Sequence, residues 1–371
     1  MRLPLIAAAA LAVAGCAAPP LNRDHPVPLV QTIDVFDRPE SVAFSLDGSI
    51  LYVGNCGSEN FGPDRRKVGF VAGRGAVSRV SIDPQGRAEL EDLRWVEGLN
   101  GPTGLAVLPR GTSKYPAGAL LVCQGLALLC DAKGEYLGDP AKLGTGILFL
   151  DGRTGRELGR IPLGVGSAIA KRLGHPVLLP NSLAFDRAGN LFVTDSGRGG
   201  QNLTPPIEAR PGLIRISKEA IDDPSAGTVG FTPVPGTPNG VAENQGRILV
   251  VTMAGGSLEG EAVYVIPASA FPLDVLPAPW AAGVGTMDGV VVTPAGTVVA
   301  SRFSGDLVAI PADRKARPVR LSPETTLNAP ADHRLLALPD GSSLLAVPEQ
   351  ARTEPLPRRQ RVRFILLPPG F

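Results

Sequence analysis

Residues 180–196 read PNSLAFDRAGNLFVTDS, and the fold is predicted from the pattern in this segment. Two short apolar runs, 183–185 and 191–193, flank a turn of Ala188, Gly189 and Asn190, which predicts a β-hairpin. Five similar units occur elsewhere in the chain. In the six units together, the residue equivalent to Asn181 is Glu40, Thr103, Asn181, Asn239, Asp288 and Asp332 in turn. The intervals between these positions are 63, 78, 58, 49 and 44 residues, so each leaves room for one four-stranded blade.

The repeats predict an all-β fold, a six-bladed β-propeller that forms a single domain over residues 31–371. A flat sheet of some two dozen strands would curl or split, whereas radial repetition protects the strand edges. The 45 Gly and 37 Pro residues disfavour helical bundles. We expect the run 31–36 to pair with 361–367 and close the ring, and the longer stretches at 58–76 and 200–212 to emerge as loops from one face.

The N-terminus has the pattern of a processing signal. Arg2 precedes an apolar run that ends at Val13-Ala14-Gly15-Cys16, which is similar to a bacterial lipoprotein cleavage box. We predict that residues 1–16 are a signal peptide region with Cys16 lipidated, that 17–30 are a Pro-rich tether, and that the protein is anchored in the outer membrane facing the periplasm. An ordinary secretory signal with an incidental Cys16 is the alternative.

Three cysteines remain for an oxidising compartment, enough for one disulfide. The spacing slightly favours Cys123–Cys130, and Cys56–Cys123 is the alternative, because these two occupy similar places in two repeats.

The charge and the motifs exclude two classes of function. A net charge of +1 does not provide the positive potential with which proteins bind nucleic acid. Gly-x-Ser-x-Gly is absent, which excludes a serine-hydrolase elbow. We expect a monomer.

The polar residues at the six repeat starts predict a cation site. In a propeller the innermost strand of each blade begins beside the central tunnel, so these side chains should face the axis together. Buried carboxylates and amides need a counter-charge, and calcium prefers six to eight oxygen ligands. Taken singly, each Asn can instead be an ordinary turn residue. Few histidines and no cysteine cluster argue against zinc or copper.

The blade motifs resemble those of the senescence-marker-protein, gluconolactonase and luciferin-regenerating-enzyme family, which has paraoxonase-like relatives. The resemblance rests on 180–196, on Met287-Asp288-Gly289-Val290 and on Trp95 to Pro102, and it spans about 38–367. It implies a propeller with a divalent cation, commonly calcium, in the tunnel and lactone or ester hydrolysis there. By motif, the metal ligands would be Glu40, Asn181, Asn239 and Asp288. Thr103 departs from the pattern, because relatives often carry an Asn or a carboxylate there.

The sequence therefore predicts a calcium-dependent hydrolase of small-molecule lactones or related esters. The resemblance assigns Asp288 as the base that takes a proton from water. His175, His333 and Asp332 are further candidates for proton handling or channel lining, as is Thr103 for channel lining. The alternative is a non-catalytic propeller of the cell envelope that binds a ligand or a protein, because this fold hosts many functions.

Overall fold

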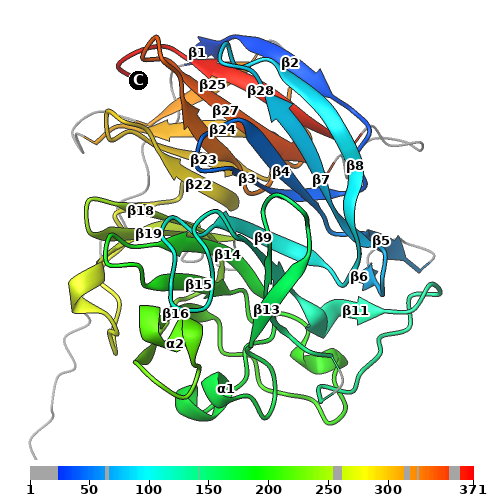
Figure 1. The fold of residues 1–371 in the computed structure, drawn as a ribbon. Coiled ribbons are helices and arrows are strands. Elements are labelled where there is room, and N and C mark those ends of the chain that lie inside the picture. The colour runs from blue at the N-terminus through cyan, green and yellow to red at the C-terminus, as the bar shows by residue number, and fades with distance from the viewer. Residues whose placement is uncertain are drawn as a thin grey trace, which may run out of the picture.

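The six predicted hairpins form the inner halves of six antiparallel sheets arranged around an axis (Figure 1). The computed structural model describes residues 24–62, 67–141, 143–253, 261–312, 318–323, 326–350 and 360–371. The innermost strands of neighbouring sheets contact one another all the way around the ring. The predicted six-bladed β-propeller is thereby confirmed.

Each of the first three blades has four strands, which run in order from the tunnel outward. Blade 1 consists of β3 (Pro39–Phe44), β4 (Ile50–Asn55), β7 (Gly75–Ile82) and β8 (Ala88–Leu99). Blade 2 consists of β9 (Pro102–Val107), β10 (Leu120–Gln124), β12 (Gly146–Leu150) and β13 (Glu157–Pro162). Blade 3 consists of β14 (Pro180–Phe185), β15 (Leu191–Asp195), β16 (Gly212–Ile216) and β17 (Val229–Pro233).

The other three blades include both ends of the domain. Blade 4 consists of β18 (Thr237–Asn244), β19 (Arg247–Met253), β20 (Ala262–Pro267) and β21 (Ala281–Ala282). Blade 5 consists of β22 (Met287–Val292), β23 (Val298–Arg302), β24 (Asp306–Ile310), β25 (Val319–Pro323) and, at its outer edge, β1 (Asp24–Val27). Blade 6 consists of β26 (Arg334–Ala337), β27 (Ser343–Glu349), β28 (Arg361–Leu367) and β2 (Leu29–Ile33).

A small three-stranded sheet lies outside the six blades. The β4–β7 connection contributes β5 (Ser58–Phe61) and β6 (Lys67–Val71), and the β10–β12 connection contributes β11 (Leu129–Cys130), which runs parallel to β6. We call these three strands the cap. In the part of the chain that the structure describes, the helical elements are α1 (Ala168–Leu173), α2 (Lys218–Asp222) and the short 3-10 turns Leu126–Leu128, Gly200–Asn202 and Ala268–Ala270.

The two ends of the domain close the ring as predicted. Ile33 pairs with Val362 and Gln31 with Phe364, so β2 becomes the outermost strand of blade 6. In Figure 1 the blue N-terminal strands lie beside the red and orange C-terminal ones. The predicted tether is too long at its C-terminal end, because β1 pairs in parallel with β25 and Val27 is buried against blade 5. Cys16 and the rest of 1–23 lie outside the described residues.

The hydrophobic core lies between neighbouring blades. Leu121 and Ile147 of blade 2, for example, pack in one cluster with Leu191 and Ile214 of blade 3. Strands such as β19 bury side chains on both faces, which explains their continuous apolar runs. Among the described residues, no helix is both long and apolar enough to cross a membrane.

The three cysteines of the domain are buried and unbonded, so the predicted disulfide is absent from the structure. Cys123 lies in β10, whereas the chain then turns away and places Cys130 in β11, beside β6 rather than β10. Burial raises the pKa of Cys56 to about 12 and that of Cys130 to about 11. These thiols therefore stay protonated at neutral pH.

Candidate functional site

A β-bulge occurs at the same point in the innermost strand of five blades. In blade 3, Pro180 pairs with Asp195 and Leu183 with Val193, so two residues, Asn181 and Ser182, face only Thr194. Register shifts at the equivalent position include Glu40, Thr103, Asn239 and Asp288. A bulge bends the strand and changes the direction of a side chain, which explains how these polar residues reach the tunnel.

Small residues follow the bulged ones because neighbouring inner strands approach closely there. A Cβ on Gly104 would collide with the backbone carbonyl of Asn181, and one on Gly240 would lie 2.6 Å from the carbonyl oxygen of Asp288. The residue pairs Thr103-Gly104 and Asn239-Gly240 thus combine a polar side chain with a packing requirement. This is the physical reason for the repeated sequence pattern.

One cavity of about 90 Å³ collects the predicted ligands. Glu40, Thr103, Asn181, Asn239 and Asp288 all line it, and each comes from a different blade. Glu40 is half-buried, and the other four are buried. The structure therefore brings the four predicted metal ligands together, and their binding of a metal stays a prediction.

The two amide side chains in this cavity are oriented by their nitrogen atoms. Asn181 Nδ2 donates to Ser196 Oγ at 3.0 Å, and Asn239 Nδ2 donates to Met253 Sδ at 2.9 Å. The Oδ1 atoms of both residues are buried and have no hydrogen-bond partner. Buried unsatisfied acceptors are rare in proteins, and a site that binds an ion is one explanation for them.

The donor set fits a hard cation. Two carboxylates and two amide oxygens are the ligands that calcium accepts, with water completing the shell. Within the described ranges, no three His, Cys, Asp or Glu side chains gather in one metal-binding cluster. That finding agrees with a cavity in which only Glu40 and Asp288 carry ionisable oxygen ligands and the remaining candidate oxygens belong to amides.

Thr103 lines the cavity, but its hydroxyl group is already used. Its Oγ1 donates to the backbone carbonyl of Pro180 at 2.6 Å and so joins blade 2 to blade 3. Thr194 Oγ1 makes the equivalent bond to the carbonyl of Asn239 at 2.6 Å, between blades 3 and 4. In this structure Thr103 is an interblade contact rather than an added ligand.

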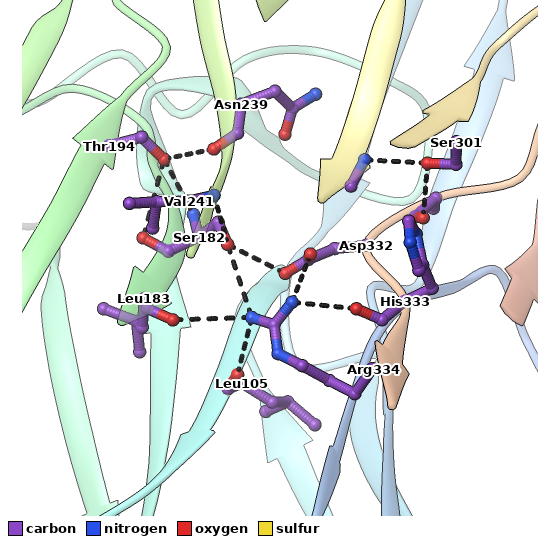
Figure 2. A network of polar contacts seen from close by, with 12 residues as sticks. Leu105, Ser182, Leu183, Thr194, Asn239, Val241, Ser301, Asp332, His333 and Arg334 are labelled. Carbon is purple, nitrogen blue, oxygen red and sulfur yellow. Dashed lines mark hydrogen bonds and ion pairs between the residues drawn. The ribbon is translucent and has the colours of Figure 1, made fainter. Parts of the chain in front are cut away.

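Asp332 does not join the other polar residues in the cavity. It accepts hydrogen bonds from Ser182 Oγ at 2.9 Å and from Arg334 Nη1 at 2.5 Å (Figure 2). Arg334 also reaches the carbonyl oxygens of Leu105 and Leu183, both at 3.4 Å, and so crosses the tunnel. Burial raises the pKa of Asp332, while Arg334 opposes that shift. Its predicted proton-handling role is replaced by a structural ion pair.

The two candidate histidines also lie away from the cavity. His333 is fully buried, its Nε2 lies 3.2 Å from the carbonyl oxygen of Val299, and burial lowers its pKa to about 4. His175 packs edge-on against Phe231, with Nδ1 3.2 Å from the carbonyl oxygen of Pro176. Neither lines the cavity, so the structure does not bring them together with the candidate ligands.

Sequence reasoning missed Arg334 and the cap. Arg334 lies two residues after the polar position of its repeat, where the other five repeats have Val42, Leu105, Leu183, Val241 and Val290. A charge at this otherwise apolar position was a readable signal. The sequence carries no comparable signal for the cap, because the three cap strands lie outside the repeats. Lining residues not identified from the sequence are Ser58, Val68, Phe70, Leu128, Leu179, Ser196, Arg198, Thr237, Met253 and Phe303.

Solved structures with the same fold include a gluconolactonase, a calcium-binding protein and a luciferin-regenerating enzyme. A gluconolactonase from Xanthomonas campestris superimposes with a TM-score of 0.56 at 14% identity, covering 92% of this chain and 91% of its own. The calcium-binding protein regucalcin from Agrobacterium tumefaciens gives 0.53 at 14% identity, covering 95% and 98%. A luciferin-regenerating enzyme gives 0.53 at 12% identity, covering 91% and 95%.

These similarities confirm the resemblance at the level of the fold. No protein-family model and no curated protein matches the sequence.

Proposed function

We propose that this protein is a calcium-dependent hydrolase of lactones or related esters, with its active site in the tunnel cavity. The observation that carries the proposal is the convergence of Glu40 and Asp288 with the partnerless amide oxygens of Asn181 and Asn239. The gluconolactonase and calcium-binding structures that share the fold support it. Glu40, Asn181, Asn239 and Asp288 would hold the cation.

A divalent cation at this position supplies a Lewis acid that polarises a carbonyl group. Asp288 is the residue we assign as general base, since its carboxylate is buried in the cavity wall. It takes a proton from water, whose oxygen bonds to the carbonyl carbon while the C=O π electrons move onto the carbonyl oxygen. The C=O bond then re-forms as the ring C–O bond breaks, and the alkoxide oxygen receives the proton from Asp288, giving a hydroxy acid.

Calcium-dependent melting and turnover test this proposal together. A ligand that binds only the folded state raises the melting temperature, so calcium should raise it and a chelator should lower it. Asp288→Ala should weaken calcium binding more than Asn239→Ala, because it removes a full negative charge. A panel of lactones and esters, assayed with and without chelator, then measures activity.

The outcomes separate the candidate functions. Calcium binding with chelator-sensitive turnover supports the hydrolase. Calcium binding without turnover on any lactone or ester favours the non-catalytic envelope protein. A purified protein without metal and without a calcium-dependent shift in melting contradicts both the cation site and the hydrolase.

We also propose that the protein is monomeric and is held in the bacterial envelope by a lipid on Cys16, in the outer membrane facing the periplasm. The support is the small-residue box before Cys16. Growth with a labelled fatty acid should mark the protein, and Cys16→Ser should abolish the label. A Cys16→Ser protein that stays labelled and membrane-bound would refute the anchor.

A further inference from the structure

The cap covers the cavity that contains the candidate ligands. Ser58, Val68 and Phe70 of the β5–β6 hairpin, and Leu128 just before β11, line the same cavity as Glu40 and Asp288. These residues come from connections of blades 1 and 2 and not from the repeated strands. The cap is therefore the part of the wall that this chain adds to the propeller.

Phe70 is the largest of the cap side chains in this wall. Its ring packs against the backbone of Gly101, where an added Cβ would lie 2.7 Å from the ring. Gly101 comes two residues before Thr103, at the start of the innermost strand of blade 2. Phe70 is also buried in a cluster with Cys56, Leu129 and Leu179, so the ring has little room to move.

Polar contacts fasten the cap to the propeller. Arg74 Nε donates to Asp37 Oδ2 at 2.9 Å, and Arg74 Nη1 donates to Glu59 Oε1 of β5 at 2.5 Å. Arg38 donates to Asn60 Oδ1 at 3.0 Å. These contacts hold β5 of the hairpin against the propeller, and β5 pairs in turn with β6, which carries Phe70.

The enclosed volume is small for a ligand site. Small-molecule pockets commonly measure about 300 to 1,000 Å³, whereas this cavity measures about 90 Å³. One water takes up about 30 Å³ in the liquid. A cavity of this volume favours a cation with a compact acyl group, and a bulky acyl group would require a larger space than the wall that includes Phe70 leaves.

We infer that Phe70 is a specificity-determining residue that restricts the site to lactones and esters with compact acyl groups. The inference rests on the proposed function, because it takes the cavity to be where the carbonyl binds. In this inference the cap limits the size of the substrate, and the blades supply the cation ligands and the general base.

A series of γ-lactones with growing substituents tests the size limit. Wild type should lose about tenfold or more in kcat/KM for each step in bulk, in the range that one methylene group causes in a fitted pocket. Phe70→Ala should raise kcat/KM for the bulky members by about tenfold relative to kcat/KM for the smallest member. Phe70→Leu is the milder variant if Phe70→Ala does not fold.

Phe61→Ala is the matched control. Phe61 lies on the same hairpin, but its ring contacts Gly134 and does not line the cavity. This variant removes an aromatic ring from the same hairpin without enlarging the site. Selectivity that changes equally in Phe61→Ala and Phe70→Ala would overturn the inference.

A second measurement does not depend on turnover. Terbium(III) takes oxygen ligands as calcium does, and its luminescence lifetime in H2O and D2O counts bound waters. In wild type, acetate should displace water from the ion and benzoate should not, whereas in Phe70→Ala both should. Benzoate that displaces water equally in wild type overturns the size limit and leaves the cation site intact. A protein that binds no terbium contradicts the proposed function and the inference with it.

Discussion

Asp288 and Asp332 occupy the same position in neighbouring repeats, and both are buried, yet their surroundings differ. A bulge in β22 places Asp288 in the cavity with Glu40. Asp332 lies before an unbulged β26, and Arg334 of that strand pairs with it. Two residues after Asp332 is Arg334, which pairs with its carboxylate, whereas two residues after Asp288 is the apolar Val290. The same repeat position therefore gives two different surroundings.

The largest expected difference between the two aspartates is in activity. Asp288→Asn should lower kcat/KM for a lactone by about 10²- to 10⁴-fold, the contribution of a positioned base. Asp332→Asn should keep most of the activity when assayed well below its melting temperature, because Asp332 does not line the cavity. Steady-state assays of the two variants measure this difference. Equal losses of kcat/KM in Asp288→Asn and Asp332→Asn would contradict a catalytic role for Asp288 alone.

The ion pair of Asp332 with Arg334 should matter for stability rather than for activity. Arg334→Met leaves the Asp332 carboxylate buried without its partner, which should lower the free energy of unfolding by about 3 to 5 kcal/mol. The exposed pair of Arg320 and Asp24 provides the control, and Arg320→Met should cost at most about 1 kcal/mol. Denaturant unfolding measures both. Similar losses in the two variants would show that the tunnel ion pair has no special role.

His333, the neighbour of Asp332, should make the fold sensitive to acid. Its pKa is about 4 in the folded protein and 6.5 at its ordinary value, so between these pH values the unfolded chain binds more protons. Stability therefore rises with pH from 4 to 6.5, by about 3 kcal/mol at 1.36 kcal/mol per pKa unit.

His333→Gln removes this titrating group and keeps a donor toward the carbonyl of Val299. Unfolding measured at pH 4, 5, 6 and 7 should show a flatter profile for His333→Gln than for wild type. Profiles with the same slope would mean that His333 does not carry the acid sensitivity.

The smallest expected effect is at Thr103. Thr103→Val leaves the carbonyl of Pro180 without its hydroxyl donor, and the loss should be about 1 kcal/mol. Calcium should still raise the melting temperature by the wild-type amount. A reduced calcium shift in Thr103→Val, seen in thermal melts, would show that Thr103 contributes to the cation site after all.

The sequence was sufficient for the propeller and for the convergence of the ligands because both follow from one repeated register. Glu40 and Asp288 are 248 positions apart, and only the ring brings their blades around one axis. The size of the site was not predictable, because Phe70 belongs to the β4–β7 connection, which lies outside the repeated strands. The pairing of β6 with β11 depends on where two unrelated loops meet in space.

Asp332 shows a different limit. Its position in the repeat is correct, but its role follows from Arg334, whose guanidinium group reaches carbonyl oxygens of blades 2 and 3. Those partners are about 150 and 230 residues away in the chain. A repeat alignment ranks positions by similarity, and so it does not reveal a contact made by one member alone.

If Cys16 carries a lipid as proposed, the start of strand β1 limits how far the domain could move from the membrane. Because β1 starts at Asp24, only the seven residues 17–23 separate it from Cys16. Seven residues reach at most about 25 Å when fully extended. With a lipid on Cys16, this short segment would keep the outer edge of blade 5 within that distance of the bilayer surface.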